Sequence, residues 1–565
     1  MRRNVIKTFL LVMLLVGLLA PLTRLLSMGQ RAADANDAEH MVTPMLTMLA
    51  QGPQTQANTA VEPMMELEDA WAIEDTREES WENPLVIGMK NGESEMGFDR
   101  ASNTFYCTLG MDGGDDWPEL ALFAQGAQGT ENLRVAWIDD YSYDYRSDAI
   151  REGYRYELLA YTDKQYAYFG VVFTGLPIVV LRVHGGAEAL SDDYVPARMC
   201  VSSAEHEAIH SGVWMHLRGG GFEKPIEKQS FRVEFHGMSD KGRDEKNARS
   251  VLGMPADTDW LLLGNAQDPT AVRNHMAWEL WNAWNEGRDD VPMLLESRMA
   301  EVFVQDEYVG LYQVMQRCDE QEELARIGGD PQRDSVVRVV SGVNKSEKMI
   351  WDLMRDVNYS LEYRYEPHGD QEKALSRAED YVTLSRWKDG DLDDEAFARM
   401  VEKRIDVENL MNYYAFFHGV ALRDHVFNNL YLYTLKRGGE TVYLHALWDM
   451  DTAFPVPQIE MGEWQGLDLN MTLTRRMMDL NLMDCREVFW SIWNEKRKNV
   501  FSDEAVSELL RGTQDWINAS GAYLRESERW YGEAMELNLE DALYYQLHNM
   551  SRAEQAMQEM WPADR

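Results

Sequence analysis

The chain has 565 residues and carries 55 Lys and Arg against 96 Asp and Glu, a formal net charge of −41 at pH 7. Negative charge of this size repels a phosphate backbone, so the composition disfavours a nucleic-acid partner. The length leaves room for two or more domains, and 18 Trp with 25 Tyr indicate a well-packed globular protein rather than a disordered one.

The first 30 residues predict a signal peptide or a signal anchor. Arg2, Arg3 and Lys7 precede an apolar run from Phe9 to Ala20. We therefore expect a secreted or cell-surface protein, whose N-terminal segment is either cleaved or kept as a membrane anchor. Residues 31–83 are rich in Ala, Gln, Met and Glu without a sustained period, and we expect them to form a linker.

Residues 84–173 consist of short alternating runs separated by Gly, Asp and Asn turns, which predicts a small all-β domain. The remaining residues, 174–565, are expected to form one domain with both strands and helices. The chain has four cysteines, Cys107, Cys200, Cys318 and Cys485, which are far apart and lack C-x-x-C spacing. This pattern indicates neither a zinc site nor a dense disulfide framework, and it leaves one or two disulfides open.

Two predicted strands, ending at Arg218 and beginning at Lys228, flank a glycine-rich turn. In a nucleotide site, Gly219 and Gly220 would let backbone amides approach phosphate, and Lys228 would neutralise its charge. The alternative is an ordinary hairpin with a flexible turn. Helical spacing of apolar residues then predicts a helix over 271–284, and its Glu279 is a candidate partner for Lys228. A hairpin is expected over 299–315.

Residues 370–417 are expected to be mostly helical and to lead into a loop of the form R-D-x-x-x-x-N, with Asp424 and Asn429. In protein kinases such a loop supplies the acceptor-side Asp and a metal-binding Asn. A hairpin turning at Gly438 follows, and then Asp449 and Asp451, hard oxygen ligands suited to Mg²⁺. The alternative is that these acidic residues only cap helices and turns. Amphipathic helices, such as 485–498 and 503–510, complete the chain.

Several ordered motifs within about residues 175–454 resemble those of spore-coat protein H (CotH-type) proteins, an atypical protein kinase family. The matching segments are Gly175-Leu-Pro, Arg218-Gly-Gly with Lys228-Gln-Ser-Phe-Arg, Asn265-Ala-Gln-Asp-Pro-Thr with Arg273-Asn, Tyr308-Val-Gly-Leu-Tyr, Asp424 with Asn429, and Trp448-Asp-Met-Asp. The resemblance implies an α+β fold: an atypical protein-kinase-like domain with a helical C-terminal part, preceded by the small all-β domain.

The resemblance also implies a function. The chain would be an exported kinase that transfers the γ-phosphoryl group of ATP, with Mg²⁺ or Mn²⁺, to Ser or Thr of secreted or surface proteins. Lys228 would contact the phosphates, Asp424 would orient or deprotonate the acceptor hydroxyl, and Asn429 with Asp449 or Asp451 would hold the metal. Arg218 is a matched position whose role the resemblance leaves unassigned.

This sequence also departs from the family pattern. The turn reads Arg218-Gly-Gly-Gly-Phe where the family commonly has R-G-N-S-S, Glu227-Lys228 stands in place of two lysines, and Gln316 stands where many members have Glu. These changes keep a second function open, a non-catalytic surface or spore-coat binding module. A glycan-processing enzyme that uses two carboxylates fits the acidic, aromatic-rich composition more loosely.

Overall fold

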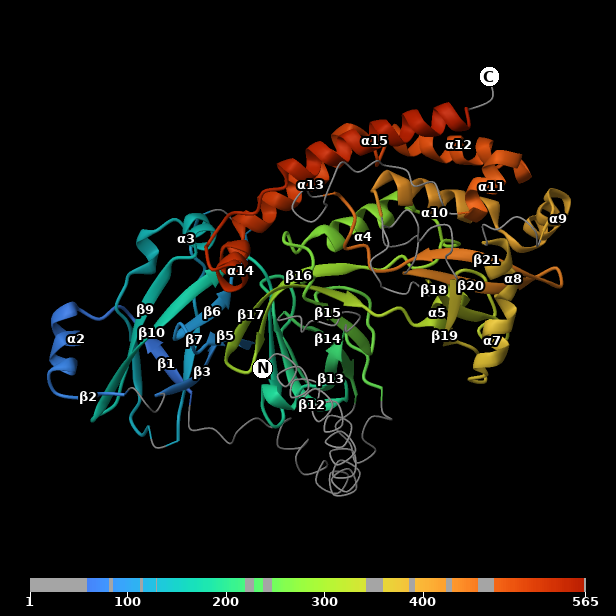
Figure 1. Cartoon of the computed structure of the whole chain (residues 1–565). Helices are drawn as coiled ribbons and strands as arrows, with labels where there is room; N and C mark the ends of the chain where they lie inside the picture. Colours follow the sequence, from blue (N-terminus) through green and yellow to red (C-terminus); the bar gives the residue numbers. More distant parts are fainter. Residues whose placement is uncertain are drawn as a thin grey trace, which may run out of the picture.

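The computed structural model describes residues 58–80, 85–111, 115–128, 130–218, 228–236, 246–341, 359–385, 392–422, 429–455 and 472–562. It has mixed α+β structure, with a large open sheet, a closed barrel and a smaller sheet covered by helices (Figure 1). The predicted signal segment, 1–30, lies outside the described residues. None of the helices that the structure describes is long and apolar enough to cross a membrane.

The first unit is an open sheet whose strand order is β4-β3-β7-β1-β8-β9-β10-β6-β5, with β2 paired to β10. Its strands are β1 (Thr59–Glu62), β2 (Glu78–Glu79), β3 (Val86–Asn91), β4 (Ser94–Glu95), β5 (Gly97–Asp99), β6 (Thr104–Thr108), β7 (Leu122–Gly126), β8 (Arg134–Trp137), β9 (Arg155–Tyr161) and β10 (Gln165–Thr174). We call this unit, residues 59–174, the N-terminal sheet domain. Its core is apolar and aromatic, and includes Phe105, Phe169 and Phe173.

The predicted boundary at residue 84 is wrong, and so is the description of this domain as all-β. Strand β1 pairs with β7 and β8, so part of the expected linker belongs to the sheet. Two helices, α2 (Leu67–Glu74) and α3 (Arg146–Glu152), pack on it. The strand escapes sequence analysis because it is four residues long and its partners lie more than 60 residues away.

The second unit is a closed barrel in the order β11-β12-β13-β14-β15-β17-β16. Its strands are β11 (Ile178–Val183), β12 (Val195–Ser202), β13 (Ile209–Arg218), β14 (Ser230–Phe235), β15 (Asp259–Leu263), β16 (Ser297–Val304) and β17 (Glu307–Gln316). The hairpin expected over 299–315 is confirmed as β16 and β17.

All four cysteines of the chain are buried free thiols, so the disulfides left open by the sequence do not form.

The third assembly is a four-stranded sheet in the order β19-β18-β20-β21. Its strands are β18 (Ser335–Ser341), β19 (Tyr359–Tyr365), β20 (Leu430–Arg437) and β21 (Glu440–Leu447). The last two form the predicted hairpin, which turns at Gly438 and Gly439, both with positive φ. Leu430 pairs with Leu447, so the loops before β20 and after β21 meet at one end of the ribbon.

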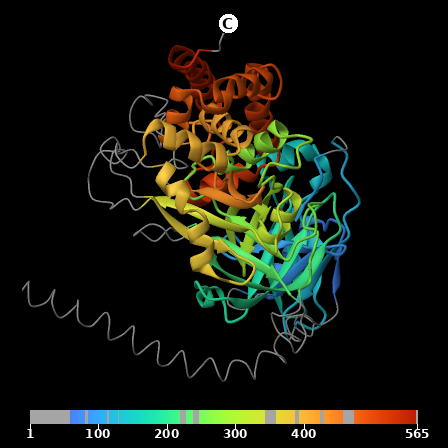
Figure 2. The same cartoon turned by 90° about the vertical axis from the view of Figure 1, so that its right-hand side faces the viewer.

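Helices pack around this sheet and extend to the end of the chain. They are α4 (Arg273–Trp284), α5 (Glu320–Arg326), α7 (Gln371–Arg377), α8 (Glu379–Leu384), α9 (Asp394–Arg404), α10 (Val407–Gly419), α11 (Thr472–Leu480), α12 (Cys485–Arg497), α13 (Asp503–Ala519), α14 (Ala522–Tyr531) and α15 (Glu540–Met560). Figure 2 shows the red C-terminal helices gathered at one end of the molecule. Helix α14 lies between the N-terminal sheet domain and strands β16 and β17 (Figure 1).

Helix α4 is the central element of the helical core. It begins two residues after the predicted start, and Trp278, Trp281 and Trp284 along it are almost fully buried. Trp284 Nε1 donates a hydrogen bond of 2.9 Å to Asn412 Oδ1 on α10. Since a buried Trp contributes a large apolar area and its N–H needs an acceptor, these contacts fix α4 against α10.

Two histidines in this core predict a loss of stability in acid. Burial lowers the pKa of His418 and of His445 to about 3, against an ordinary value near 6.5. Between about pH 6.5 and 3 these histidines are protonated in the unfolded chain but neutral in the folded chain. As the pH falls through this range, each histidine therefore lowers the free energy of unfolding by about 1.4 kcal/mol per pH unit. We expect His445→Gln to flatten this dependence in urea unfolding curves recorded from pH 7 to 4. The exposed His548 provides the control, and His548→Gln should leave the slope unchanged.

Candidate active site

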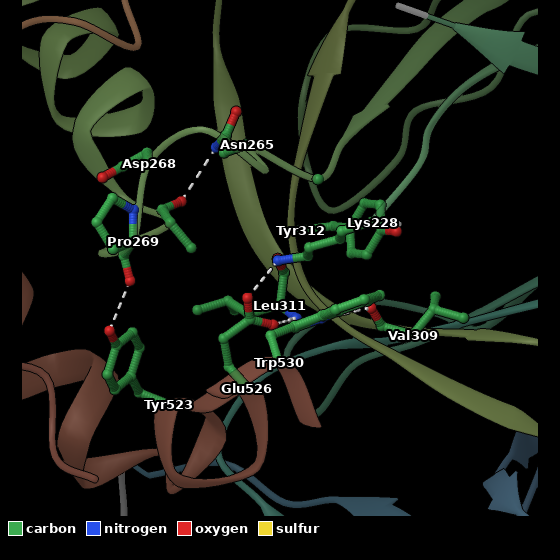
Figure 3. A network of polar contacts seen from close by, with 12 residues as sticks. Lys228, Asn265, Asp268, Pro269, Val309, Leu311, Tyr312, Tyr523, Glu526 and Trp530 are labelled. Carbon is green, nitrogen blue, oxygen red and sulfur yellow. Dashed lines mark hydrogen bonds and ion pairs between the residues drawn. The ribbon is translucent and has the colours of Figure 1, made fainter. Parts of the chain in front are cut away.

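One buried lysine is held at the junction of the barrel and the C-terminal helices. Lys228 lies just before β14, and its side chain is 6% exposed. Its Nζ donates a hydrogen bond of 2.9 Å to the carbonyl oxygen of Leu311 on β17 and forms an ion pair with Glu526 on α14 (Figure 3). The ring of Tyr312 lies 5.2 Å from the same Nζ. The ammonium group is therefore fixed by contacts from two elements that are distant in sequence.

Glu526 uses both of its carboxylate oxygens in this arrangement. Oε1 faces Lys228, and Oε2 accepts a hydrogen bond of 2.7 Å from the backbone N–H of Leu311. Burial lowers the pKa of Lys228, and the charge of Glu526 opposes that shift. A buried ammonium without such a partner would tend to lose its proton. The carboxylate of Glu526 thus favours the charged form of Lys228.

The close approach of α14 to β17 depends on a glycine. Gly310 has a φ of +119°, and a Cβ atom at this position would collide with Glu526 Oε2. It would also lie 2.9 Å from Trp530 Nε1, which itself donates to the carbonyl oxygen of Val309 at 3.3 Å. The glycine of the Tyr308-Val-Gly-Leu-Tyr motif is therefore required because it lets Glu526 reach both Lys228 and Leu311.

The prediction that Glu279 pairs with Lys228 is wrong. Glu279 lies on α4 with its side chain 50% exposed, and it pairs with His275 at 3.4 Å on the same helix. Its position on the outer face of α4 excludes contact with a lysine that is almost fully buried. The true partner follows Lys228 by 298 residues, and no local spacing in the sequence indicates such a contact.

The turn before α4 connects the barrel to the acidic loop after β21. Asp268, which is buried, accepts hydrogen bonds from Thr270 N at 3.0 Å and from Arg273 N at 2.9 Å at the start of the helix. The guanidinium of Arg273 then donates to the carbonyl oxygens of Asp451 and Phe454. A carboxylate near a helix N-terminus is electrostatically favourable, and here it also orients the arginine that holds the loop.

A second polar group from α4 fixes the same loop. Asn274, which is fully buried, accepts a hydrogen bond of 2.9 Å from the backbone N–H of Met450. Its amide nitrogen donates to Gln313 Oε1, also at 2.9 Å, on β17. Asp449, which precedes Met450, has a positive φ of 61°. The backbone around Asp449 is therefore positioned by α4 rather than by the hairpin alone.

Arg218 and Arg338 are the basic groups whose charges act on Asp449. Burial raises the pKa of its carboxyl, while Arg218 and then Arg338 lower it. Arg218, the last residue of β13, lies 5.3 Å from the ring of Trp448. Burial lowers the pKa of Arg218, with Asp449 opposing the shift. Arg218 and Trp448 are both half-buried, and their contact joins the barrel to the loop after β21.

Asn429 completes this end of the sheet. It lies directly before β20, is buried, and has a positive φ of 58°. Its Oδ1 accepts a hydrogen bond of 3.1 Å from Arg338 Nη2 on β18. Since Arg338 also acts on Asp449, the structure brings together Asn429 and Asp449 at the meeting end of the β20–β21 ribbon, as the hairpin predicted.

The side chains at this end of the ribbon carry oxygen atoms of the type that a divalent metal ion takes. Asn429 has an amide oxygen, and Asp449 and Asp451 have carboxylates, which are hard donors of the kind that Mg²⁺ prefers. Asp451 is half-buried, and its main chain is held by Arg273. Gly219, Gly220 and Asp424, which the sequence places at this site, lie outside the described residues.

Most of the residues in this site lie in a segment that matches a known protein family. Residues 215–559 match the sequence model of the family described as CotH kinase protein, which is more than half of the chain. The match begins in β13 and ends in α15, so it includes Lys228, Glu526 and the loops before β20 and after β21, but not the N-terminal sheet domain. A search of curated proteins finds no match.

Proposed function

Because the chain belongs to the CotH kinase protein family, we propose that it is an exported protein kinase. It transfers the γ-phosphoryl group of ATP to Ser or Thr hydroxyls of secreted or surface proteins. One observation carries this proposal: a buried, carboxylate-held lysine and the loop of hard oxygen donors are both tied to β17. Lys228 bonds to Leu311 on this strand, and the loop is linked to it through Met450, Asn274 and Gln313. Phosphoryl transfer needs a cation on the phosphates and a metal-binding group beside them.

Each group has a role in this proposal. Lys228 and Arg218 contact the phosphates, while Asn429, Asp449 and Asp451 hold Mg²⁺ or Mn²⁺. The metal neutralises phosphate charge when bound. Asp424 orients the acceptor hydroxyl and takes its proton as the hydroxyl oxygen bonds to the γ-phosphorus. The bond from that phosphorus to the bridging oxygen breaks, and ADP leaves.

The groups of this site that the structure describes are buried or half-buried, which supports their catalytic use. Charges that are partly removed from water interact more strongly than exposed ones, and preorganised charges need no rearrangement as the transition state forms. Lys228 is fixed by Glu526 and Leu311, and the backbone at Asp449 is fixed by Asn274. Lys228 and the backbone at Asp449, which phosphoryl transfer needs in fixed positions, are therefore both held by buried partners.

Asp449→Asn provides the test. We expect the variant to lower autophosphorylation with Mg²⁺ and ATP labelled at the γ-position by about 10²-fold or more, because the metal loses a charged ligand. The exposed Asp541 on α15 supplies the matched control, and Asp541→Asn should retain the parent rate. Circular dichroism should show that both variants are folded.

The second candidate function is a non-catalytic surface binding module, and the same experiment tests it. Arg338 already donates to Asn429, and two guanidinium groups act on Asp449, which favours a site closed by internal contacts. No label in the parent, together with no change in its melting temperature on adding ATP and Mg²⁺ or Mn²⁺, would support a non-catalytic surface binding module. Label in both the parent and Asp449→Asn at equal rates would contradict the assigned metal ligand.

A further inference from the structure

A second cluster of metal-ligating side chains lies where the N-terminal sheet domain meets the barrel. It consists of Glu95 from β4, Cys200 from β12 and His210 from β13. One ligand atom from each residue lies within 4.8 Å of the other two. Glu95 and Cys200 are buried, while His210 is exposed at the edge of the junction. The proposed kinase site uses none of these residues.

Two of the three ligands are positioned by strand register. Cys200 and His210 are direct partners on the antiparallel strands β12 and β13, so their side chains share one face of the barrel wall. Their Sγ and Nδ1 atoms are 3.2 Å apart. Such a pair is set by the backbone and does not depend on a flexible loop.

The third ligand comes from the other domain. The Cys200 thiol lies 3.0 Å from Glu95 Oε2. The carbonyl oxygen of Glu95 accepts a hydrogen bond of 2.8 Å from Ser202 Oγ, which fixes the end of β4 against β12. The carboxylate therefore reaches the thiol from a strand that is itself anchored to the barrel.

The hydrogen bonds of His210 determine which of its nitrogens carries a lone pair. Nε2 lies 2.9 Å from the carbonyl oxygen of Glu93. A carbonyl can only accept, so Nε2 carries the hydrogen, and in the neutral imidazole Nδ1 presents its lone pair toward Cys200 Sγ. A histidine that binds a metal through one nitrogen while donating from the other to a backbone carbonyl is oriented in this way.

We propose that Glu95, Cys200 and His210 bind a zinc ion that links the N-terminal sheet domain to the barrel. One sulfur, one imidazole nitrogen and one carboxylate oxygen are ligands that Zn²⁺ accepts, and three protein ligands leave a fourth position for water. Zinc bonds of about 2.3 Å to sulfur and about 2.1 Å to nitrogen or oxygen place tetrahedral ligands roughly 3.6 Å apart. The contacts of 3.0 and 3.2 Å need to open by only about half an ångström.

Two arginines moderate the affinity of this site. Arg198 Nη2 lies 3.1 and 2.8 Å from the two oxygens of Glu95, and Arg182 Nε lies 3.2 Å from Oε1. They orient the carboxylate but also neutralise much of its charge, so the thiolate and the imidazole supply most of the binding. We therefore expect Cys200→Ser to weaken zinc more strongly than any change at Glu95.

Cobalt is the probe that detects a thiolate ligand directly. The full chain, reduced and freed of metal by a chelator, should bind one equivalent of Co²⁺ and develop a thiolate-to-metal charge-transfer band with visible d–d bands. Zn²⁺ should displace the cobalt and raise the melting temperature. Cys200→Ser should abolish the charge-transfer band, and His210→Gln should lower the affinity for Co²⁺ by at least tenfold.

The exposed His206, four residues from His210, provides the matched control. His206→Gln should bind cobalt as the parent does. His210→Gln is the main variant because its side chain is exposed and its loss should leave the fold intact. A parent without the charge-transfer band would overturn the proposal. A band that persists unchanged in Cys200→Ser or in His210→Gln would overturn it as well, since the metal would then lie elsewhere.

Discussion

Replacing Glu526 by glutamine should destabilise the protein by about 3 kcal/mol and lower phosphoryl transfer by about 10²-fold or more. Glu526 accepts from Lys228 with one oxygen and from the Leu311 N–H with the other. A glutamine has one oxygen, so its NH₂ group must face one of these two donors. Either the ammonium or the backbone N–H then loses its acceptor inside a buried site.

The expected kinetic effect follows from the position of Lys228. Without the carboxylate the lysine either loses its proton or moves toward water, and in both cases positive charge leaves the proposed phosphate site. Urea unfolding should measure the stability change, and transfer rates at varied ATP concentration should separate kcat from KM. Glu528→Gln, which alters an exposed residue on the same helix, is the control and should change neither. A folded Glu526→Gln with the parent kcat and KM would show that Lys228 does not serve the reaction.

Replacing Arg525 by methionine should cost about 3–5 kcal/mol of stability. Arg525 makes two parallel hydrogen bonds, of 2.7 and 2.8 Å, to the carboxylate of Glu301 on β16, and both residues are buried. Its guanidinium also lies 5.9 Å from the ring of Tyr106 in the N-terminal sheet domain. The variant leaves Glu301 charged and buried without a partner, which is the costly half of a broken ion pair.

A double variant separates the charge effect from the packing effect. Arg525→Met with Glu301→Leu removes both charges, and we expect it to recover most of the lost stability. Arg529→Met on the same helix removes an exposed ion pair with Glu307 and should cost about 1 kcal/mol or less. If the single and double variants unfold at the same urea concentration, the unpaired charge of Glu301 is not what destabilises Arg525→Met. Arg525→Met should also raise the KM for ATP, because Glu526 is its neighbour on α14.

The sequence predicted the parts of the fold that depend on local patterns. The hairpin at Gly438, the hairpin of β16 and β17, and helix α4 follow from alternation, helical spacing and turn residues within a few positions of one another. The same patterns placed Asn429 and Asp449 at one end of a ribbon, and the structure confirms this. Local patterning also gave the helical character of α7 to α10.

The rest could not be predicted because it depends on contacts between distant segments. Helix α14 has an amphipathic pattern like its neighbours, and nothing in it indicates that Glu526 enters the site of Lys228. Gly310 gave the one available signal, since a glycine inside a strand often marks a close approach. Cysteine spacing tests only for metal ligands close in sequence, whereas Cys200 and Glu95, which we propose as zinc ligands, are 105 residues apart.

The pairing of Lys228 with Glu526 also determines when the proposed site can first form during synthesis. The ribosome makes Lys228 long before Glu526, since 298 residues separate them. Until α14 has been synthesised and has packed against β17, the lysine has no carboxylate partner and the barrel lacks the helix that covers it. A partly made chain therefore cannot assemble the site as it folds from its N-terminus. The position of one glutamate 298 residues after its lysine thus delays assembly of the proposed site until α14 has been made.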